Sequence, residues 1–216
     1  MFGREHLEAA VRDHPESVPA KVLLENFHHF TAIRDVAGGW IPGWGSYMFN
    51  GQAYEYQRET LKKQEALFRV GQVSKNLLEV GVYLGHSLLI LLASNPTLKI
   101  TCIDNDTRYA PKVVEYLNQH FNGRLTFIAG DAVEVMRTFP DNTFDAVHID
   151  ADHTVAAVEA QFAEARRLAI AGASIVFDDY EATRTPIDAW IAQGILQHVT
   201  TPWCLWTNIV TNILKD

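Results

Sequence analysis

The fold of this chain is decided by the stretch Leu77-Leu-Glu-Val-Gly-Val-Tyr-Leu-Gly-His-Ser87. The apolar run 77–80 predicts a short, buried parallel strand, and the apolar residues that follow Ser87 predict a helix. Gly81 and Gly85 lie in the turn between them, where glycine lets the backbone approach a ligand closely. A strand, a glycine-containing turn and a helix in this order predict a binding site for a nucleotide-type cofactor.

The glycine spacing distinguishes this turn from the common dinucleotide-binding turn. The dinucleotide fingerprint is G-x-G-x-x-G, whereas this chain has E-x-G-x-x-x-G, with Glu79 two residues ahead of Gly81. The stretch resembles motif I of the class I S-adenosylmethionine-dependent methyltransferases. The resemblance implies that S-adenosylmethionine, rather than a nicotinamide dinucleotide, is the cofactor.

Composition limits the classes of partner. The 216 residues are 48% hydrophobic and 20% charged, which suits one well-buried domain with an N-terminal extension. The net charge of -8 and the lack of a Lys/Arg cluster argue against nucleic acid. The N-terminus lacks the apolar stretch of a signal peptide, and no run is long enough to span a membrane. Cys102 and Cys204 lie in apolar runs, as buried free thiols do. We therefore expect a soluble cytoplasmic protein.

The alternation of short apolar runs with helical patterns after residue 75 predicts an α/β fold. We expect a Rossmann-like, seven-stranded, mostly parallel sheet with helices on both faces. The expected strands are 77–80, 99–103, 125–128, 146–149, 174–177, 196–200 and 204–213, and the expected helices are 85–93, 111–121, 132–138, 153–170 and 186–193. Gly123 and Gly172 are expected to stop helices. The short Thr201-Pro-Trp203 connection predicts that the last two strands form an antiparallel hairpin.

The first 75 residues are expected to form a helical extension to the cofactor-binding domain 76–216. The predicted helices are 4–12, 20–36 and 52–70, the last stopped by Gly71. Between the second and third helices lies a glycine-rich loop with an aromatic set, Trp40, Trp44, Tyr47 and Phe49. Such a loop can cover an apolar ligand, or its aromatics can pack on the domain or on a partner subunit of a homo-oligomer. The sequence leaves these alternatives open.

Aspartates follow four of the predicted strands, at the sheet edge where ligands bind in open α/β folds. Asp104 is placed to accept hydrogen bonds from ribose hydroxyls, or it is a turn residue. Asp131 and Ala132 are interpreted as contacts of the adenine, although Asp131-Ala-Val-Glu134 also has the pattern of a capping box.

Asp150, Asp178 and Asp179 end two neighbouring strands and predict a site for a hard cation such as Mg²⁺. The alternative is helix capping, which would explain one carboxylate at each strand end but not the pairs. His153 follows Asp150 closely and is the predicted general base, with Asp152 as the second candidate. A solvated first-turn histidine is the alternative for His153.

The same segments carry a narrower resemblance. Glu79-Val-Gly-Val-Tyr83-Leu-Gly85-His-Ser87 looks like the cofactor loop of the metal-dependent, catechol O-methyltransferase-like branch, which implies cofactor contacts from Glu79, Gly81, Tyr83 and Ser87. Gly85 is expected to contact the cofactor as well, because glycine lets the backbone approach a ligand closely. The branch implies ribose binding by Asp104 and metal binding by Asp150, Asp178 and Asp179. The wording Ile-Asp-Ala-Asp-His and Val-Phe-Asp-Asp-Tyr resembles macrocin-type sugar and small-molecule O-methyltransferases.

One position departs from the catechol-type pattern. Those enzymes have a lysine three residues after the metal aspartate, where this chain has His153. The departure favours a sugar-like or natural-product hydroxyl as acceptor. The sequence therefore predicts Mg²⁺-dependent O-methylation of a hydroxyl group on a small molecule. Two alternatives stay open: a metal-dependent nucleotide-sugar glycosyltransferase, because Asp150-Ala-Asp152 is a D-x-D triplet, and a non-catalytic S-adenosylmethionine-binding protein.

Overall fold

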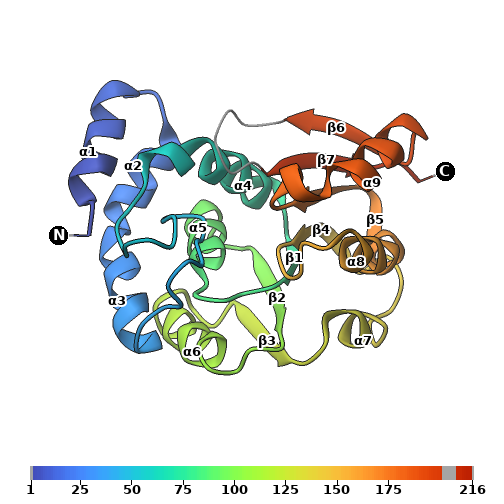
Figure 1. The fold of residues 1–216 in the computed structure, drawn as a ribbon, viewed down its shortest axis with the longest axis horizontal. Coiled ribbons are helices and arrows are strands. Elements are labelled where there is room, and N and C mark those ends of the chain that lie inside the picture. The colour runs from blue at the N-terminus through green and yellow to red at the C-terminus, as the bar shows by residue number, and fades with distance from the viewer. Residues whose placement is uncertain (1, 201–207, 216) are drawn as a thin grey trace.

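The computed structural model describes residues 2–200 and 208–215, which form an α/β fold around a seven-stranded sheet (Figure 1). The strand order is β3-β2-β1-β4-β5-β7-β6. The strands are β1 (Asn76–Val80), β2 (Lys99–Asp104), β3 (Leu125–Ala129), β4 (Phe144–Ile149), β5 (Ala169–Phe177), β6 (Leu196–Thr200) and β7 (Ile209–Ile213). Strands β1 to β5 run parallel, and β7 pairs antiparallel with both β5 and β6. The predicted fold and its C-terminal antiparallel pair are confirmed, while Thr201, Pro202 and Trp203 lie outside the described residues.

Helices cover both faces of the sheet (Figure 1). They are α1 (Arg4–Asp13), α2 (Val18–Glu25), α3 (Phe27–Ala37), α4 (Leu61–Val73), α5 (His86–Ser94), α6 (Ala110–His120), α7 (Ala132–Met136), α8 (Val155–Leu168) and α9 (Tyr180–Ala192), with a 3-10 turn η1 (Arg58–Thr60) before α4. No helix in the described part of the chain is long and apolar enough to cross a membrane.

Successive residues of a strand pack into two separate hydrophobic clusters, one on each face of the sheet. In β1, Leu77 packs into the cluster that contains α5 and α6, and Leu78 and Val80 pack into the cluster that contains α8. This alternation follows from the two-residue period of a strand. The same period places Glu79 on the face of Leu77, directly beside its β4 partner His148.

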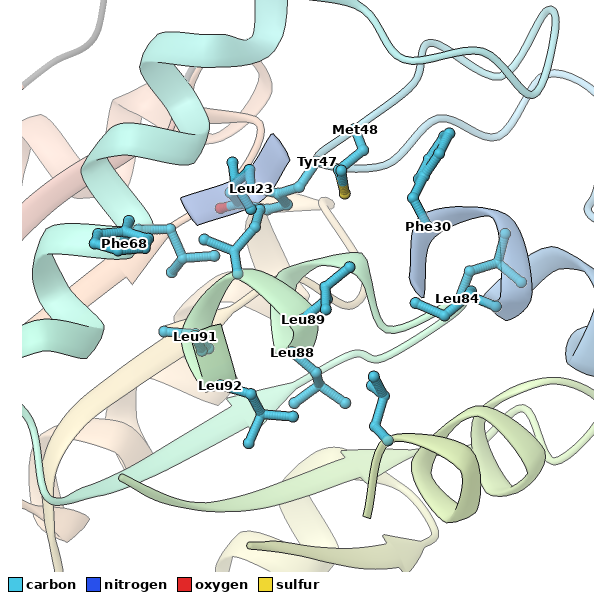
Figure 2. Close-up of a cluster of buried hydrophobic side chains, with 14 of the residues drawn as sticks. Leu23, Phe30, Tyr47, Met48, Phe68, Leu84, Leu88, Leu89, Leu91 and Leu92 are labelled. Carbon is cyan, nitrogen blue, oxygen red and sulfur yellow. The ribbon is translucent and has the colours of Figure 1, made fainter. Parts of the chain in front are cut away.

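The N-terminal region shares one core with the sheet domain. Figure 2 shows Leu23, Tyr47 and Phe68 from the first 70 residues on one side of α5, whose leucines Leu88, Leu89, Leu91 and Leu92 belong to the same buried cluster. Helices α4 and α5 approach closely at Gly71, where a Cβ atom would lie 2.2 Å from the Ser94 Oγ. Burial of this apolar surface holds the residues before 75 against the cofactor-binding half.

Two of the predicted N-terminal helices are wrong in extent. The helix expected over 20–36 is interrupted at Asn26, whose side-chain amide donates to the Val22 carbonyl and so ends α2. The helix expected over 52–70 begins only after Gln57, because Tyr54 and Tyr56 are buried in the core from an irregular segment instead. Gly71, predicted as its stop, lies inside α4.

Boundaries also differ in the second half. Gly172 lies inside β5 with a φ of 78°, so it kinks a strand rather than stopping a helix, and β5 begins at Ala169 instead of residue 174. The helix expected from residue 153 begins at Val155, because the Thr154 side chain caps it. The helix expected after Pro186 begins at Tyr180 and contains that proline.

Candidate active site

A cavity of about 450 Å³ opens at the carboxyl ends of β1, β4 and β5. Its size is that of a pocket for a small ligand or cofactor. It is lined by the glycine turn after β1, by the aspartates after β4 and β5, and by side chains from the N-terminal region: Gly43, Trp44, Gly45, Ser46, Tyr47, Phe49, Asn50, Thr60, Lys63, Gly81, Val82, Tyr83, His86, Ser87, Asp150, Ala151, His153, Asp178 and Asp179.

The glycine turn is fastened to its neighbours by backbone contacts. Gly81 has a φ of 94°, and a Cβ atom there would lie 2.1 Å from the carbonyl oxygen of Asp150. Asp104 at the end of β2 accepts hydrogen bonds from the Val82 and Tyr83 amides, both at 2.8 Å. Its other oxygen accepts from the Asp106 amide at 2.7 Å. Asp104 therefore holds the glycine turn in place through its backbone amides. Its side chain does not line the cavity.

Tyr83 closes one side of the cavity in a strained backbone conformation. Its φ is 47°, which is unfavourable for a residue with a side chain. The hydroxyl accepts a hydrogen bond from the Ile41 amide at 2.8 Å, and the ring lies edge to face with Trp44 at 5.6 Å between centroids. Trp44 is 54% exposed, whereas Tyr47 and Phe49 are buried. Trp44 therefore lies at the mouth of the cavity, whereas Tyr47 and Phe49 line it from the buried core.

Under the glycine turn lies a buried polar chain. Glu79 is fully buried and accepts a hydrogen bond from the Ser87 hydroxyl, and its second oxygen lies 3.8 Å from Nδ1 of His148. The other nitrogen of His148 is 2.8 Å from the Tyr47 hydroxyl. Burial alone would lower the pKa of His148, but the Glu79 and Asp150 carboxylates outweigh it and raise the pKa. These contacts connect the Glu79 carboxylate in β1 to Tyr47 in the N-terminal region.

The aspartates after β4 and β5 converge on His153. The Nδ1 atom of His153 lies 2.5 Å from the Asp179 carboxylate, and its Nε2 lies 3.4 Å from the Asp150 carboxylate. Burial would lower the pKa of His153, yet these two carboxylates raise it to about 10. His153 is therefore an imidazolium at neutral pH and holds the proton that the predicted base would have to accept.

Asp178 is paired with a buried lysine that the sequence analysis missed. The Nζ atom of Lys63 lies 2.6 Å from the Asp178 carboxylate, and the two side chains are 5% and 6% exposed. Nζ also lies 4.4 Å from the centre of the Tyr47 ring. Burial would lower the pKa of Lys63, but Asp178 and Asp150 raise it, so the ammonium is charged. One sequence signal could have found it: Lys63 lies four residues before Leu67, on the buried face of a helix.

The predicted magnesium ligands do not fit a cation as the structure places them. Lys63 is paired with Asp178, and His153 bridges Asp150 and Asp179. In residues 2–200 and 208–215, no group of three or more His, Cys, Asp or Glu side chains is arranged to hold a metal ion. The carboxylates are brought together as predicted, but two side-chain cations already compensate their charge.

The loop over the cavity is attached to α5 through His86. The Tyr54 hydroxyl donates to the Phe30 carbonyl at 2.6 Å, so its oxygen accepts from Nε2 of His86 at 2.8 Å. The Nδ1 atom is then free to accept from the Ser46 hydroxyl at 2.7 Å. Burial lowers the pKa of His86 to about 3, which keeps this neutral bridge intact.

The structure brings seven of the predicted site residues to the cavity wall: Gly81, Tyr83, Ser87, Asp150, His153, Asp178 and Asp179. Six others do not line it: Glu79, Gly85, Asp104, Asp131, Ala132 and Asp152. Asp131 caps α7 through the Glu134 amide, as the capping-box alternative predicted. Asp152 accepts from the Thr154 amide and is exposed, so the D-x-D triplet does not present two carboxylates to the cavity.

Comparison with known proteins agrees with this geometry. Residues 78–180 match the family model described as a methyltransferase domain. The fold is similar to that of a Klebsiella pneumoniae protein assigned to the O-methyltransferases, at 18% identity, with a TM-score of 0.65 over 87% of this chain and 90% of that chain. It is similar to an O-methyltransferase from Bacillus cereus in complex with SAH, at 15% identity, with a TM-score of 0.62 over 87% of this chain and 91% of that chain.

A third solved structure with this fold is the O-methyltransferase TomG from Streptomyces achromogenes, involved in tomaymycin synthesis and in complex with SAM. It shares 15% identity, with a TM-score of 0.64 over 87% of this chain and 90% of that chain. A search of curated proteins gave no match. Residues 78–180 are therefore a methyltransferase domain, and the fold of the chain is one that these solved O-methyltransferases share.

Proposed function

We propose that this protein transfers a methyl group from S-adenosylmethionine to a hydroxyl oxygen of a small molecule. The observation that carries the proposal is the cavity itself, which joins the glycine turn after β1 to a cluster of carboxylates after β4 and β5. A methyl donor on the glycine turn would then face acid–base groups across one enclosed space. The three similar solved structures, all assigned to O-methyltransferases, support the choice of oxygen as acceptor atom.

The cofactor end of the cavity is the wall formed by Gly81, Tyr83 and Ser87. The resemblance to motif I supports cofactor contacts from these residues. Asp104 would act by holding the turn in place, and Asp131 with Ala132 stay predicted adenine contacts. When bound, S-adenosylmethionine supplies a methyl carbon that a hydroxyl oxygen can attack, with the electron pair of the carbon–sulfur bond leaving on sulfur.

The acceptor end of the cavity must remove the hydroxyl proton. His153 is already protonated, and Asp152 lies away from the cavity, so neither predicted base is in a state and place to act. Asp178 is better placed, because burial and the neighbouring Asp150 carboxylate raise its pKa to about 7. A carboxylate with a pKa near the working pH is an effective general base. We therefore assign the proton to Asp178, with no metal step.

Calorimetric titration with S-adenosylhomocysteine tests the cofactor half of the proposal. We expect binding at one site per chain, and we expect Gly81→Val to abolish it. Glu134→Ala is the control, because this exposed side chain lies outside the cavity. Absence of binding to the wild-type protein would refute the proposal. Release of S-adenosylhomocysteine during turnover of hydroxyl-containing acceptors, lost in Asp178→Asn, tests the catalytic half.

A further inference from the structure

Resting on the function proposed above, we propose that the Lys63 ammonium takes the place of a divalent cation in this site and donates a hydrogen bond to the acceptor oxygen. This assignment reverses the magnesium dependence predicted from the sequence. It makes Lys63, which comes from the N-terminal region, a catalytic residue of the methyltransferase domain.

Lys63 is buried in a place where a positive charge is energetically unfavourable. Its side chain is 5% exposed, and a buried ammonium is unfavourable unless it is paired. Lys63 also lies in the first turn of α4, where the helix dipole disfavours a positive charge. Its neighbour Lys62 has a 53% exposed side chain and pairs with the Glu65 carboxylate, whose side chain is 11% exposed. The burial of Lys63 is therefore specific to the site.

Lys63 and His153 compensate the charge of the aspartate cluster. Asp150, Asp178 and Asp179 would repel one another at the strand ends without nearby cations. Lys63 and His153 supply two positive charges in direct contact with these three carboxylates. A Mg²⁺ ion would need carboxylate oxygens that are free of such partners. With both cations in place, a divalent ion would have to displace an ammonium that is enclosed by Tyr47 and Asp178.

The Lys63 ammonium is oriented so that it can donate into the cavity. An ammonium has three N–H donors, and Asp178 accepts from one of them. The Tyr47 ring covers one side of Nζ, and Lys63 lines the cavity wall. A donor thus remains for an oxygen inside the cavity, next to the Asp178 carboxylate that we assign as base. One pair of side chains can hold the acceptor oxygen and take its proton.

The single charge of Lys63 limits which hydroxyl groups the site can activate. A single positive charge lowers the pKa of a neighbouring hydroxyl less than a divalent metal ion does. A phenol, with an ordinary pKa of about 10, comes within reach of neutral pH, whereas an alkyl hydroxyl, which ionises near the value of about 16 for water, does not. The site therefore favours phenolic or enolic hydroxyls over the sugar-like acceptors that the sequence suggested.

The step balances without a metal or a redox partner. The acceptor oxygen forms a bond to the methyl carbon as the carbon–sulfur bond breaks, and the bonding pair stays on sulfur. The hydroxyl proton passes to the Asp178 carboxylate, and Lys63 keeps its own proton and stabilises the oxygen's developing negative charge. S-adenosylhomocysteine and a methyl ether are the products.

Titration with Mn²⁺, followed by calorimetry and electron paramagnetic resonance, tests the assignment on the full chain. We expect the wild-type protein to show no saturable Mn²⁺ binding up to about 1 mM. Lys63→Met removes the ammonium and leaves the carboxylates, so we expect it to gain Mn²⁺ affinity by about tenfold or more. Lys62→Met is the matched control and should behave like the wild type. Lys63→Gln, checked by its thermal melting curve, is a second variant if the methionine variant folds poorly.

Two outcomes would overturn the proposal. The first is stoichiometric Mn²⁺ binding by the wild-type protein that Asp150→Asn abolishes. The second is a folded Lys63 variant that gains no Mn²⁺ affinity. S-adenosylhomocysteine binding is measured in the same samples, since its absence from the wild type would instead refute the proposed function. The affinity of the wild-type protein for S-adenosylhomocysteine should be the same with and without a chelator.

An activity measurement tests the acceptor class. In the presence of a chelator, we expect methyl transfer to 4-nitrophenol by the wild type and a loss of about 100-fold in kcat for Lys63→Met. Equal transfer by the variant would overturn the role of Lys63. Transfer to methyl glucoside by the wild type under the same conditions would overturn the preference for acidic hydroxyls.

Discussion

The two regions that form the cavity differ in how their polar residues are placed. The aspartates come from the ends of β4 and β5, where the pairing of parallel strands brings any strand-end residue to the same edge. Lys63, Tyr47 and Ser46 come from helix α4 and the loop before η1, and they reach the cavity because the N-terminal region packs on α5. The acidic side chains of the cavity thus follow from the topology of the sheet, while the cations that pair with them depend on tertiary packing.

The largest expected effect tests whether the two regions are coupled through charge. Asp178→Ala leaves the Lys63 ammonium buried beside Asp150 without its closest partner. We expect the free energy of unfolding, measured by urea denaturation, to fall by about 3–5 kcal/mol. Lys62→Ala, which removes an ion pair whose lysine is half-exposed, should cost about 1 kcal/mol or less.

The double variant Lys63→Met/Asp178→Ala sharpens this test. Because it removes both charges, we expect it to be more stable than Asp178→Ala alone. If Asp178→Ala unfolds at the same urea concentration as the wild type, the pair does not couple the two regions.

The second effect tests the packing of the strand ends. Gly81→Ala places a Cβ atom 2.1 Å from the Asp150 carbonyl oxygen at a φ of 94°. We expect a loss of about 2–4 kcal/mol in the free energy of unfolding, with loss of S-adenosylhomocysteine binding. Gly172→Ala is the matched control, because its φ of 78° imposes similar strain but nothing lies within 4 Å of the added atom. Equal losses in both variants would show that the close approach to β4 does not matter.

The third effect is a pH dependence of stability, which tests whether neutral His86 attaches the loop over the cavity to α5. The pKa of His86 is about 3 in the folded protein, compared with 6.5 for an exposed histidine. The unfolded chain therefore binds a proton first as the pH falls, so the stability from neutral His86 is present above pH 6.5 and is lost towards pH 3.

Denaturation at a series of pH values measures this contribution. Between pH 6.5 and about 5, we expect the wild type to lose about 1–2 kcal/mol more than His86→Asn. Parallel curves for the two proteins would mean that His86 does not stay neutral in the folded state.

The smallest effect separates the role of Asp104 from that of an ordinary structural aspartate. Asp104→Asn weakens the hydrogen bonds to the Val82 and Tyr83 amides, so we expect the Kd for S-adenosylhomocysteine to rise about tenfold in calorimetry. Asp145→Asn is the control, because Asp145 accepts from the Lys75 and Asn76 amides at the opposite end of β1. A similar Kd change in both variants would indicate a general loss of order.

The sequence predicted the sheet and most strand-end residues correctly because these follow local rules. Apolar runs and turn residues determine where a strand ends, and parallel pairing then brings those ends together. It predicted the N-terminal helices less well, because Tyr54 and Tyr56 are buried from an irregular segment that no helical period describes. It also gave His153 the role of base, since the contact with Asp179 that raises its pKa is visible only in three dimensions.

The sequence by itself determined the methyltransferase domain, its glycine turn and the aspartates beside that turn, because residue type and spacing along one chain segment are sufficient for these features. Only the tertiary structure decided the charge state of the site. Lys63 lies 115 residues from Asp178 along the chain, and its contact depends on how α4 packs against α5. A buried charge is compensated by whatever cation the fold brings within a few ångströms, and spacing in the sequence does not encode that distance.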